Sequence, residues 1–288
     1  MEKITLLVNS CDAYSDLWDL FFKALQVQWP DCKFPVALLS ETKNYPGYPD
    51  LKVINFNSPC WGEMLKNALK EIETPYVLPF LDDFVLKEKF TGHKVIDRAV
   101  KMLDENPDIG VVYLHRHPYA LQDRTEFEGF GLIPRKASYK LTTYFGLWRK
   151  TYLDKCIWGT ENPWEWETLI SRYAWRFKER EYALLKDSEE IFEITGGGVL
   201  KGGRWNQEAK IWADRYGVEI DFSKRGFFDE NEIYHVRKHF PRDIFRKKFW
   251  LESRQRIRAG LRKIFIKLKI LFACVNAGFF LTENADEF

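Results

Sequence analysis

The chain has 288 residues, of which 45% are apolar and 16% aromatic, so it can bury a sizeable core and is not intrinsically disordered. Its 44 basic and 42 acidic residues give a net charge of only +2, which excludes a strongly charged chain as a whole. The charge is unevenly spread, however, because residues 237–271 hold 13 Lys and Arg against two acids and leave 31 basic and 40 acidic residues elsewhere.

Strand and helix patterns alternate along the first 115 residues. The predicted strands are 4–8, 35–39, 52–56, 76–81 and 109–114, and the predicted helices are 14–28, 62–72 and 92–106. This alternation predicts an α/β fold whose mostly parallel sheet is flanked by helices on both faces. Ligands of such sheets bind beyond the carboxyl ends of the strands, so the segments that follow the strands are the first candidates for a site.

The pattern is less regular from residue 116 to 235. We expect a polar loop at 122–131, a strand at 139–147, a helix from Pro163 and another helix at 207–216. Beyond this region, basic side chains alternate with apolar ones in the manner of amphipathic helices. The sequence therefore predicts one domain over 1–236 and a basic helical tail over 237–288.

The fourth predicted strand runs directly into two carboxylates, Asp82 and Asp83. Mn²⁺ and Mg²⁺ prefer oxygen ligands, usually one or two carboxylates completed by water and phosphate. The pair is therefore a candidate metal site, and the alternative is that Asp merely begins a turn. With Phe84-Val85-Leu86 after it, the segment resembles the metal-binding DxD region of GT-A glycosyltransferases, although Leu81 stands two positions before Asp83.

The resemblance extends over residues 1 to about 220 and implies a GT-A-like half-Rossmann sheet that binds a nucleotide diphosphate sugar with Mn²⁺ or Mg²⁺. It assigns Asp83 to the metal and Asp82 to the metal or the ribose. The nucleoside would lie at the ends of the first two strands and before the next helix, which implies the donor-binding residues Asn9, Ser10, Asp12, Ser40, Glu41 and Trp61. Trp61 would stack on the base, and the alternative is a core aromatic residue.

Three glutamates, Glu161, Glu165 and Glu167, crowd the start of the helix predicted from Pro163. Asn162 and Glu165 fit a capping box, but a carboxylate among tryptophans also loses hydration, which raises its pKa toward the range of a general base. The segment resembles the "ED…R" helix start of inverting family-2-like glycosyltransferases, with Trp166 where the Asp is expected. The resemblance implies Glu165, or else Glu167, as the base that deprotonates the acceptor hydroxyl.

A glycine-rich stretch at 196–203 follows, and it contains Lys201 and precedes Arg204. Glycine amides and nearby cations favour anions, so the stretch predicts a mobile loop that closes over a diphosphate. It lacks the spacing of a Walker loop. Lys201-Gly-Gly-Arg204-Trp205 is similar to the QxxRW motif of the same enzymes, which makes Lys201 and Arg204 candidate donor ligands; an ordinary glycine-rich turn is the alternative.

The apolar residues of the tail at 257, 261, 264, 265, 268 and 271 fall on one helical stripe, with most basic residues off it. A basic amphipathic helix of this kind binds the anionic face of a membrane; packing on the body is the alternative. No nucleic-acid-binding motif accompanies the charge, so no nucleic-acid partner is expected. The apolar runs are too short for a signal peptide or a membrane-spanning helix, and five scattered cysteines indicate a reducing compartment.

These patterns and resemblances predict a cytoplasmic, membrane-peripheral glycosyltransferase. It would move a sugar, with inversion, from a nucleotide diphosphate sugar to a saccharide or lipid-linked acceptor in surface polysaccharide biosynthesis. One alternative is a sugar-phosphate nucleotidyltransferase, whose glycine-rich loop after the first strand is missing here. Another is a non-catalytic membrane-docked scaffold. His115 and His117 receive no role, whereas His235 or His239 is a candidate further metal ligand.

Overall fold

The structure is a computed structural model that describes residues 3–118, 120, 126–188, 190–195 and 197–229. Apart from Asp229, these residues belong to one compact unit, Met1–Phe228. The tail at 237–288, together with His235 and His239, lies outside the described residues, so the boundary at 236 and the membrane contact stay predictions. Within the described part, no helix is long and apolar enough to cross a bilayer, and the four cysteines are free thiols.

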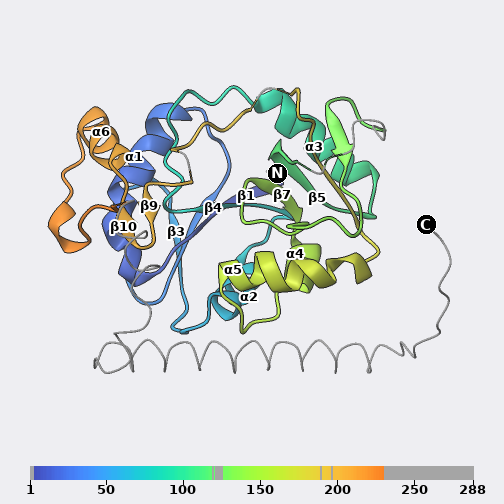
Figure 1. The fold of residues 1–288 in the computed structure, drawn as a ribbon, viewed down its shortest axis with the longest axis horizontal. Helices are drawn as coiled ribbons and strands as arrows, with labels where there is room; N and C mark the ends of the chain where they lie inside the picture. The colour runs from blue at the N-terminus through green and yellow to red at the C-terminus, as the bar shows by residue number, and fades with distance from the viewer. Residues whose placement is uncertain (1–2, 119, 121–125, 189, 196, 230–288) are drawn as a thin grey trace, which may run out of the picture. The chain divides into compact units, whose positions relative to one another are not determined.

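An eight-stranded sheet forms the centre of the unit (Figure 1). Its spatial order is β3 (Lys52–Asn55), β2 (Val36–Ser40), β1 (Ile4–Asn9), β4 (Tyr76–Leu81), β7 (Gly146–Arg149), β5 (Ile109–Arg116), β8 (Arg180–Leu184) and β6 (Phe130–Leu132). Strands β7 and β6 run antiparallel to their neighbours, and the other six run parallel to one another. The predicted α/β fold with a mostly parallel sheet is therefore confirmed.

Helices cover both faces of this sheet (Figure 1). One face carries α1 (Trp18–Gln28) and α3 (His93–Glu105), and the other carries α2 (Trp61–Glu71), α4 (Lys150–Cys156) and the segment 166–170. Strand β1 shows why both faces are apolar: Leu6 and Val8 point to the first layer, and Leu7 points to the second. Alternate side chains of a strand face opposite sides, so a strand buried twice reads as a continuous apolar run.

A third layer packs on the outer side of α1. It consists of α6 (Glu208–Tyr216) and the hairpin of β9 (Leu200–Lys201) and β10 (Arg204–Trp205), which contact α1 through a separate apolar cluster. The hairpin turns at Gly202 and Gly203 with φ of 60° and 79°, a geometry that favours glycine at both positions. Residues 200–205 thus pair as a hairpin and do not form an irregular loop, while the closure over a diphosphate stays a prediction.

The strand predicted at 139–147 is also misplaced, because only Gly146–Arg149 pairs in the sheet. The preceding residues bond to side chains instead: Leu141 donates its amide to Ser171 Oγ at 3.0 Å, and Thr142 donates to the Tyr113 hydroxyl at 3.3 Å. Strands β6 and β8 and helix α4 were not predicted. Strand β7 lies between β4 and β5, so these two strands do not pair with each other.

Candidate functional site

The carboxyl ends of β1, β2 and β4 meet at one edge of the sheet. Asn9 is in register with Leu39 of β2 and Leu81 of β4, so the residues that follow the three strands become neighbours. They line a cavity of about 580 Å³, here called the sheet-edge cavity. Eight of the predicted site residues line it: Asn9, Ser10, Glu41, Trp61, Asp82, Asp83, Glu167 and Lys201.

Asp82, which is buried, and Asp83, which is half-buried, form a pair of carboxylates at this edge. Asp82 accepts a hydrogen bond from the Ser10 hydroxyl, and Ser10 Oγ accepts one from Trp18 Nε1 at 2.6 Å. Burial and the neighbouring charge of Asp83 raise the pKa of Asp82 well above its usual range. Burial also raises the pKa of Asp83 to about 7. Two adjacent carboxylates with raised pKa values are ionised together at neutral pH more readily when a cation offsets their charge.

The glycine-rich segment packs directly on Asp83. Val199 donates its amide to the Asp83 carbonyl at 2.9 Å. Gly198 has a φ of 93°, and a Cβ at this position would lie 2.4 Å from Asp83 Oδ2. Only glycine therefore combines this backbone conformation with this close approach to the carboxylate.

The pair fits a divalent cation. Hard cations take one or two carboxylates and complete their shell with phosphate oxygens and water. No three His, Cys, Asp or Glu side chains of the described segments are arranged to hold a metal. Asp82 and Asp83 would thus hold a cation whose other ligands come from a bound diphosphate and water.

Asp12 serves the cavity indirectly, since it does not line it. Its Oδ1 accepts the amides of Glu41, Thr42 and Lys43 at 3.2, 3.0 and 3.1 Å. Desolvation acts to raise the pKa of Asp12, but these hydrogen bonds, with one from the Thr42 hydroxyl, outweigh it and lower the pKa to about 2. The Asp12 amide in turn donates to Glu41. Asp12 therefore positions Glu41, which lines the cavity.

Two tryptophans line the same cavity in different ways. Trp61 is the first residue of α2, is partly buried and packs on Trp166, with ring centroids 5.8 Å apart. It therefore belongs both to the edge of the core and to the cavity wall. Trp164 has 71% of its surface exposed and is not among the predicted site residues. An exposed indole beside a polar cavity suits the apolar face of a sugar.

The three glutamates at 161, 165 and 167 differ in their burial and in their hydrogen-bond partners. Glu161 is fully buried and accepts the amides of Trp158 and Thr160 at 2.6 and 2.8 Å. Glu165 is buried in the capping box with Asn162 and lines no described cavity.

Glu167 lies in the π-helical turn Trp166–Ile170 and does line the sheet-edge cavity. Its Oε1 accepts the Thr142 hydroxyl, the Thr143 amide and the Thr143 hydroxyl at 3.0, 2.6 and 2.8 Å. These three bonds fix the carboxylate and leave Oε2 without a hydrogen bond from the described residues.

The two basic residues predicted to bind the donor, Lys201 and Arg204, lie in different places. Lys201 in β9 lines the sheet-edge cavity, with its Nζ 4.6 Å from the centroid of the Phe228 ring. Arg204 in β10 lines none of the described cavities.

Arg225 is not among the residues predicted from the sequence. Its Nε and a terminal nitrogen donate to Asp16 at 2.7 and 2.6 Å, and its charge acts to lower the pKa of Asp82. Its guanidinium lies 4.7 Å from the centroid of the Tyr14 ring, and Tyr14 lines the cavity.

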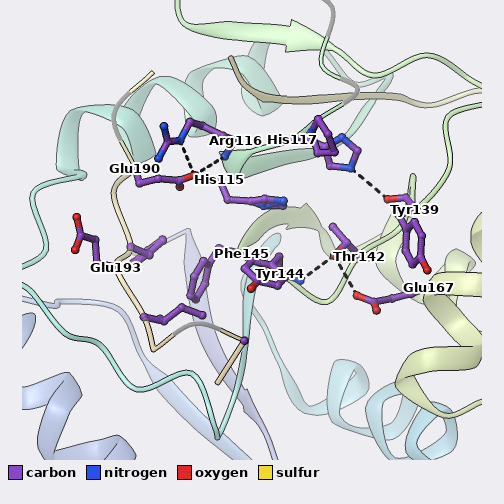
Figure 2. A pocket seen from close by; sticks show the side chains of 14 residues that line it. His115, Arg116, His117, Tyr139, Thr142, Tyr144, Phe145, Glu167, Glu190 and Glu193 are labelled. Carbon is purple, nitrogen blue, oxygen red and sulfur yellow. Dashed lines mark hydrogen bonds and ion pairs between the residues drawn. The ribbon is translucent and has the colours of Figure 1, made fainter. Parts of the chain in front are cut away.

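A second cavity, of about 720 Å³, shares Tyr144, Glu167 and Gly197 with the first. Figure 2 shows that His115 and His117, from the end of β5, contribute its upper wall. We call it the histidine cavity. The sequence offered one signal for it, the pair of histidines at a strand end.

No protein-family model and no curated protein sequence matches this chain. A mannosyltransferase from Pyrobaculum calidifontis, solved with GDP-Man and Mn²⁺, is 14% identical with a TM-score of 0.46 over 70% of this chain, which spans 58% of that protein. Residues 1–349 of S. aureus TarS, solved with UDP-GlcNAc, are 14% identical with a TM-score of 0.45, covering 78% of this chain and 69% of that one.

A cytidylyltransferase from Leptospira borgpetersenii is 12% identical with a TM-score of 0.39, covering 68% of this chain and 82% of that one. The similar structures thus include nucleotide-sugar transferases, the class that the sequence resembles, and also a nucleotidyltransferase. At these identities and TM-scores they establish no substrate or activity for this chain.

Proposed function

We propose that the protein is a glycosyltransferase that uses a nucleotide diphosphate sugar together with Mn²⁺ or Mg²⁺. The observation that carries this proposal is the pair of adjacent carboxylates, Asp82 buried and Asp83 half-buried, at the carboxyl edge of a mostly parallel sheet. The pair lies in a cavity of about 580 Å³, a volume typical of small-molecule sites, at the edge where such sheets bind their ligands.

The donor would lie along the sheet-edge cavity. Asn9, Ser10 and Glu41 offer hydrogen bonds to the nucleoside, and Trp61 offers a flat face for the base. A cation held by Asp82 and Asp83 would offset the charge that develops on the leaving diphosphate. Lys201 of the hairpin lines the same cavity and would add a second positive charge.

Glu167 is the base in this proposal, in preference to Glu165, because it lines the cavity while Glu165 caps a helix. The acceptor hydroxyl loses its proton to Oε2 of Glu167. The acceptor oxygen then bonds to the anomeric carbon. The bond from that carbon to the diphosphate oxygen breaks, and its electron pair leaves on the diphosphate. Attack from the face opposite the diphosphate inverts the anomeric centre.

Thermal unfolding of the full chain with nucleotides tests the donor site. We expect one of UDP, GDP and dTDP, with Mn²⁺, to raise the Tm by about 5–10 °C at a hundredfold excess over its Kd. Asp83→Asn and Asp82→Asn should abolish the metal-dependent part, and Asp97→Asn, an exposed aspartate of α3, should keep it.

A response to CTP or UTP without a response to the diphosphates would favour a nucleotidyltransferase. The absence of any nucleotide response would favour a non-catalytic scaffold and would contradict the proposal.

A further inference from the structure

Three rings lie next to one another at the end of β5, and two of them, His115 and His117, line the histidine cavity. Tyr113, His115 and His117 are spaced by two residues, so their side chains lie on the same side of the strand. Ring centroids are 5.5 Å apart between Tyr113 and His115 and 5.8 Å apart between the two histidines. The Tyr144 ring meets His115 edge-on, with ring centroids 5.2 Å apart, and Tyr144 also lines the sheet-edge cavity.

One atom of this group lacks a partner. Nδ1 of His115 is buried, and the side chain is 9% exposed, yet no described residue bonds to this nitrogen. A buried polar atom without a hydrogen bond carries a desolvation cost that a ligand can remove. His117 differs, because its Nε2 lies 3.3 Å from the carbonyl oxygen of Tyr139, and this contact fixes its ring (Figure 2).

The charges of the cavity are distinctive. Arg116 Nε lies 2.8 Å from Glu190 Oε1, so this cation is already paired (Figure 2). Glu193 and Glu167 also line the cavity, and they leave an excess of negative charge. Burial lowers the pKa of His115 to about 3 and also lowers the pKa of His117, so both imidazoles are neutral at pH 7.

Neutral imidazoles and an excess of carboxylates select against anions. A neutral imidazole has one donor and one acceptor nitrogen, which matches a hydroxyl group, and it offers no positive charge to a phosphate. Tyr144 and Tyr139, the latter 54% exposed, add flat faces for the apolar side of a sugar ring.

We propose that the histidine cavity is the acceptor site and that it binds an uncharged, polyhydroxylated moiety, a sugar or polyol, in preference to a phosphorylated or carboxylated one. The inference rests on the proposed function. A hydroxyl bound beside His115 lies near the wall that the two cavities share, and Glu167 in that wall receives its proton. In a lipid-linked acceptor, this site would hold the sugar and not the phosphate.

Saturation-transfer NMR on the full chain with the stabilising nucleotide and Mn²⁺ tests this assignment. The probes are the methyl glycosides of glucose, galactose and mannose, compared with glucose 6-phosphate and glucuronic acid at the same concentration. We expect at least one neutral glycoside to give a signal at least five-fold above the signals of the anionic sugars.

His115→Phe keeps the ring but removes both nitrogens, and it should reduce the glycoside signal at least five-fold. His115→Gln restores a donor and an acceptor and should recover part of it. His93→Phe replaces an exposed histidine of α3 as the matched control and should leave it unchanged.

Three results would overturn the inference: no glycoside signal in the wild type, an equal signal in His115→Phe, or a stronger signal from the anionic sugars. The nucleotide response in thermal unfolding separates the two hypotheses. If the nucleotide stabilises the protein while glycoside binding ignores His115, the acceptor assignment fails and the proposed function stands. If no nucleotide stabilises the protein, the proposed function fails, and the acceptor assignment that rests on it fails as well.

Discussion

Glu165 and Glu167 are two residues apart, yet the fold gives them unrelated surroundings. Glu165 is the third residue of a capped helical turn, where its Oε2 accepts the Asn162 amide at 3.0 Å. The π-helical turn that follows carries Glu167 to the loop at 142–143 and into both cavities. One motif in the sequence thus contains a cap and a candidate base.

This difference predicts opposite results for two matched variants. Glu167→Gln should lower the rate of sugar transfer by about 10²–10⁴-fold, the usual contribution of a general base, with nucleotide binding unchanged. Glu165→Gln should retain transfer, because glutamine also completes a capping box. The measurements are initial rates and nucleotide-dependent Tm shifts for both variants. Normal transfer in Glu167→Gln would exclude it as the base.

His115 predicts a pH dependence of stability. Burial lowers its folded pKa to about 3, whereas an unfolded chain has a value near 6.5, so below pH 6.5 the unfolded state binds a proton that the folded state does not. Stability therefore falls as the pH falls, by about 2 kcal/mol between pH 7 and pH 5 from this group.

Urea unfolding at the two pH values measures this loss. His115→Phe should lose about 2 kcal/mol less than the wild type on going from pH 7 to pH 5, and His93→Phe should match the wild type. An equal loss in all three proteins would show that His115 takes up a proton in the folded state.

At the scale of elements, the contact of Gly198 with Asp83 links the glycine-rich segment to the carboxylate pair. Gly198→Ala places a methyl group against the carboxylate, so it should abolish metal-dependent stabilisation by the nucleotide. Gly217→Ala is the matched control, since Gly217 lines neither cavity and also has a positive φ, but a Cβ there meets nothing within 4 Å.

Both variants should lose about 1 kcal/mol of stability from the strained backbone, and only Gly198→Ala should lose the metal response. Parallel titrations with nucleotide and Mn²⁺ check this. An intact response in Gly198→Ala would mean that Asp83 does not depend on the segment.

The loop before β7 depends on a buried ion pair. Lys140 Nζ lies 3.5 Å from Glu181 Oε1, with side-chain exposures of 1% and 0%, and the Tyr152 hydroxyl donates to the same carboxylate. Lys140→Met should cost about 3–5 kcal/mol, because it leaves a buried charge without its partner. Adding Glu181→Gln should recover part of this loss.

Lys155→Met is the control, since Lys155 pairs with Glu179 at 2.8 Å on the surface, and it should cost at most about 1 kcal/mol. Chemical unfolding of the variants measures these differences. Equal losses at Lys140 and Lys155 would contradict the role of the buried pair.

The same loop shows why the sequence predicted some elements and not others. The strands up to residue 114 are continuous apolar runs with helices between them, so local patterns suffice, and Asp82 and Asp83 follow from a strand end. Residues 139–145 also look strand-like, but buried partners such as Ser171 and Glu181 hold Lys140 and Leu141 out of the sheet. The histidine cavity combines segments near 116, 140 and 192, whose proximity depends on long-range pairing that no local pattern encodes.

At the scale of the whole chain, the membrane association of the basic segment at 237–271 stays a prediction. Each basic residue near an anionic surface contributes on the order of 1 kcal/mol, so deletion of 237–288 should release the protein from vesicles that contain anionic lipid. Cosedimentation at low and high salt measures this, because salt screens the attraction. Unchanged binding of the truncated protein would contradict the prediction, and neutral vesicles provide the control.

Strand β7 separates the ends of β4 and β5, and this separation sets the spacing of the two cavities. Because β7 is antiparallel, it starts at the edge where β4 and β5 end, and the chain that enters it delivers Thr142, Thr143 and Tyr144 between the two cavities. The ends of β4 and β5 are therefore two strand spacings, about 10 Å, apart. The rigid sheet sets the distance across which the two substrates would meet, so acceptor choice can change through the loops near 140 and 192 while that distance stays constant.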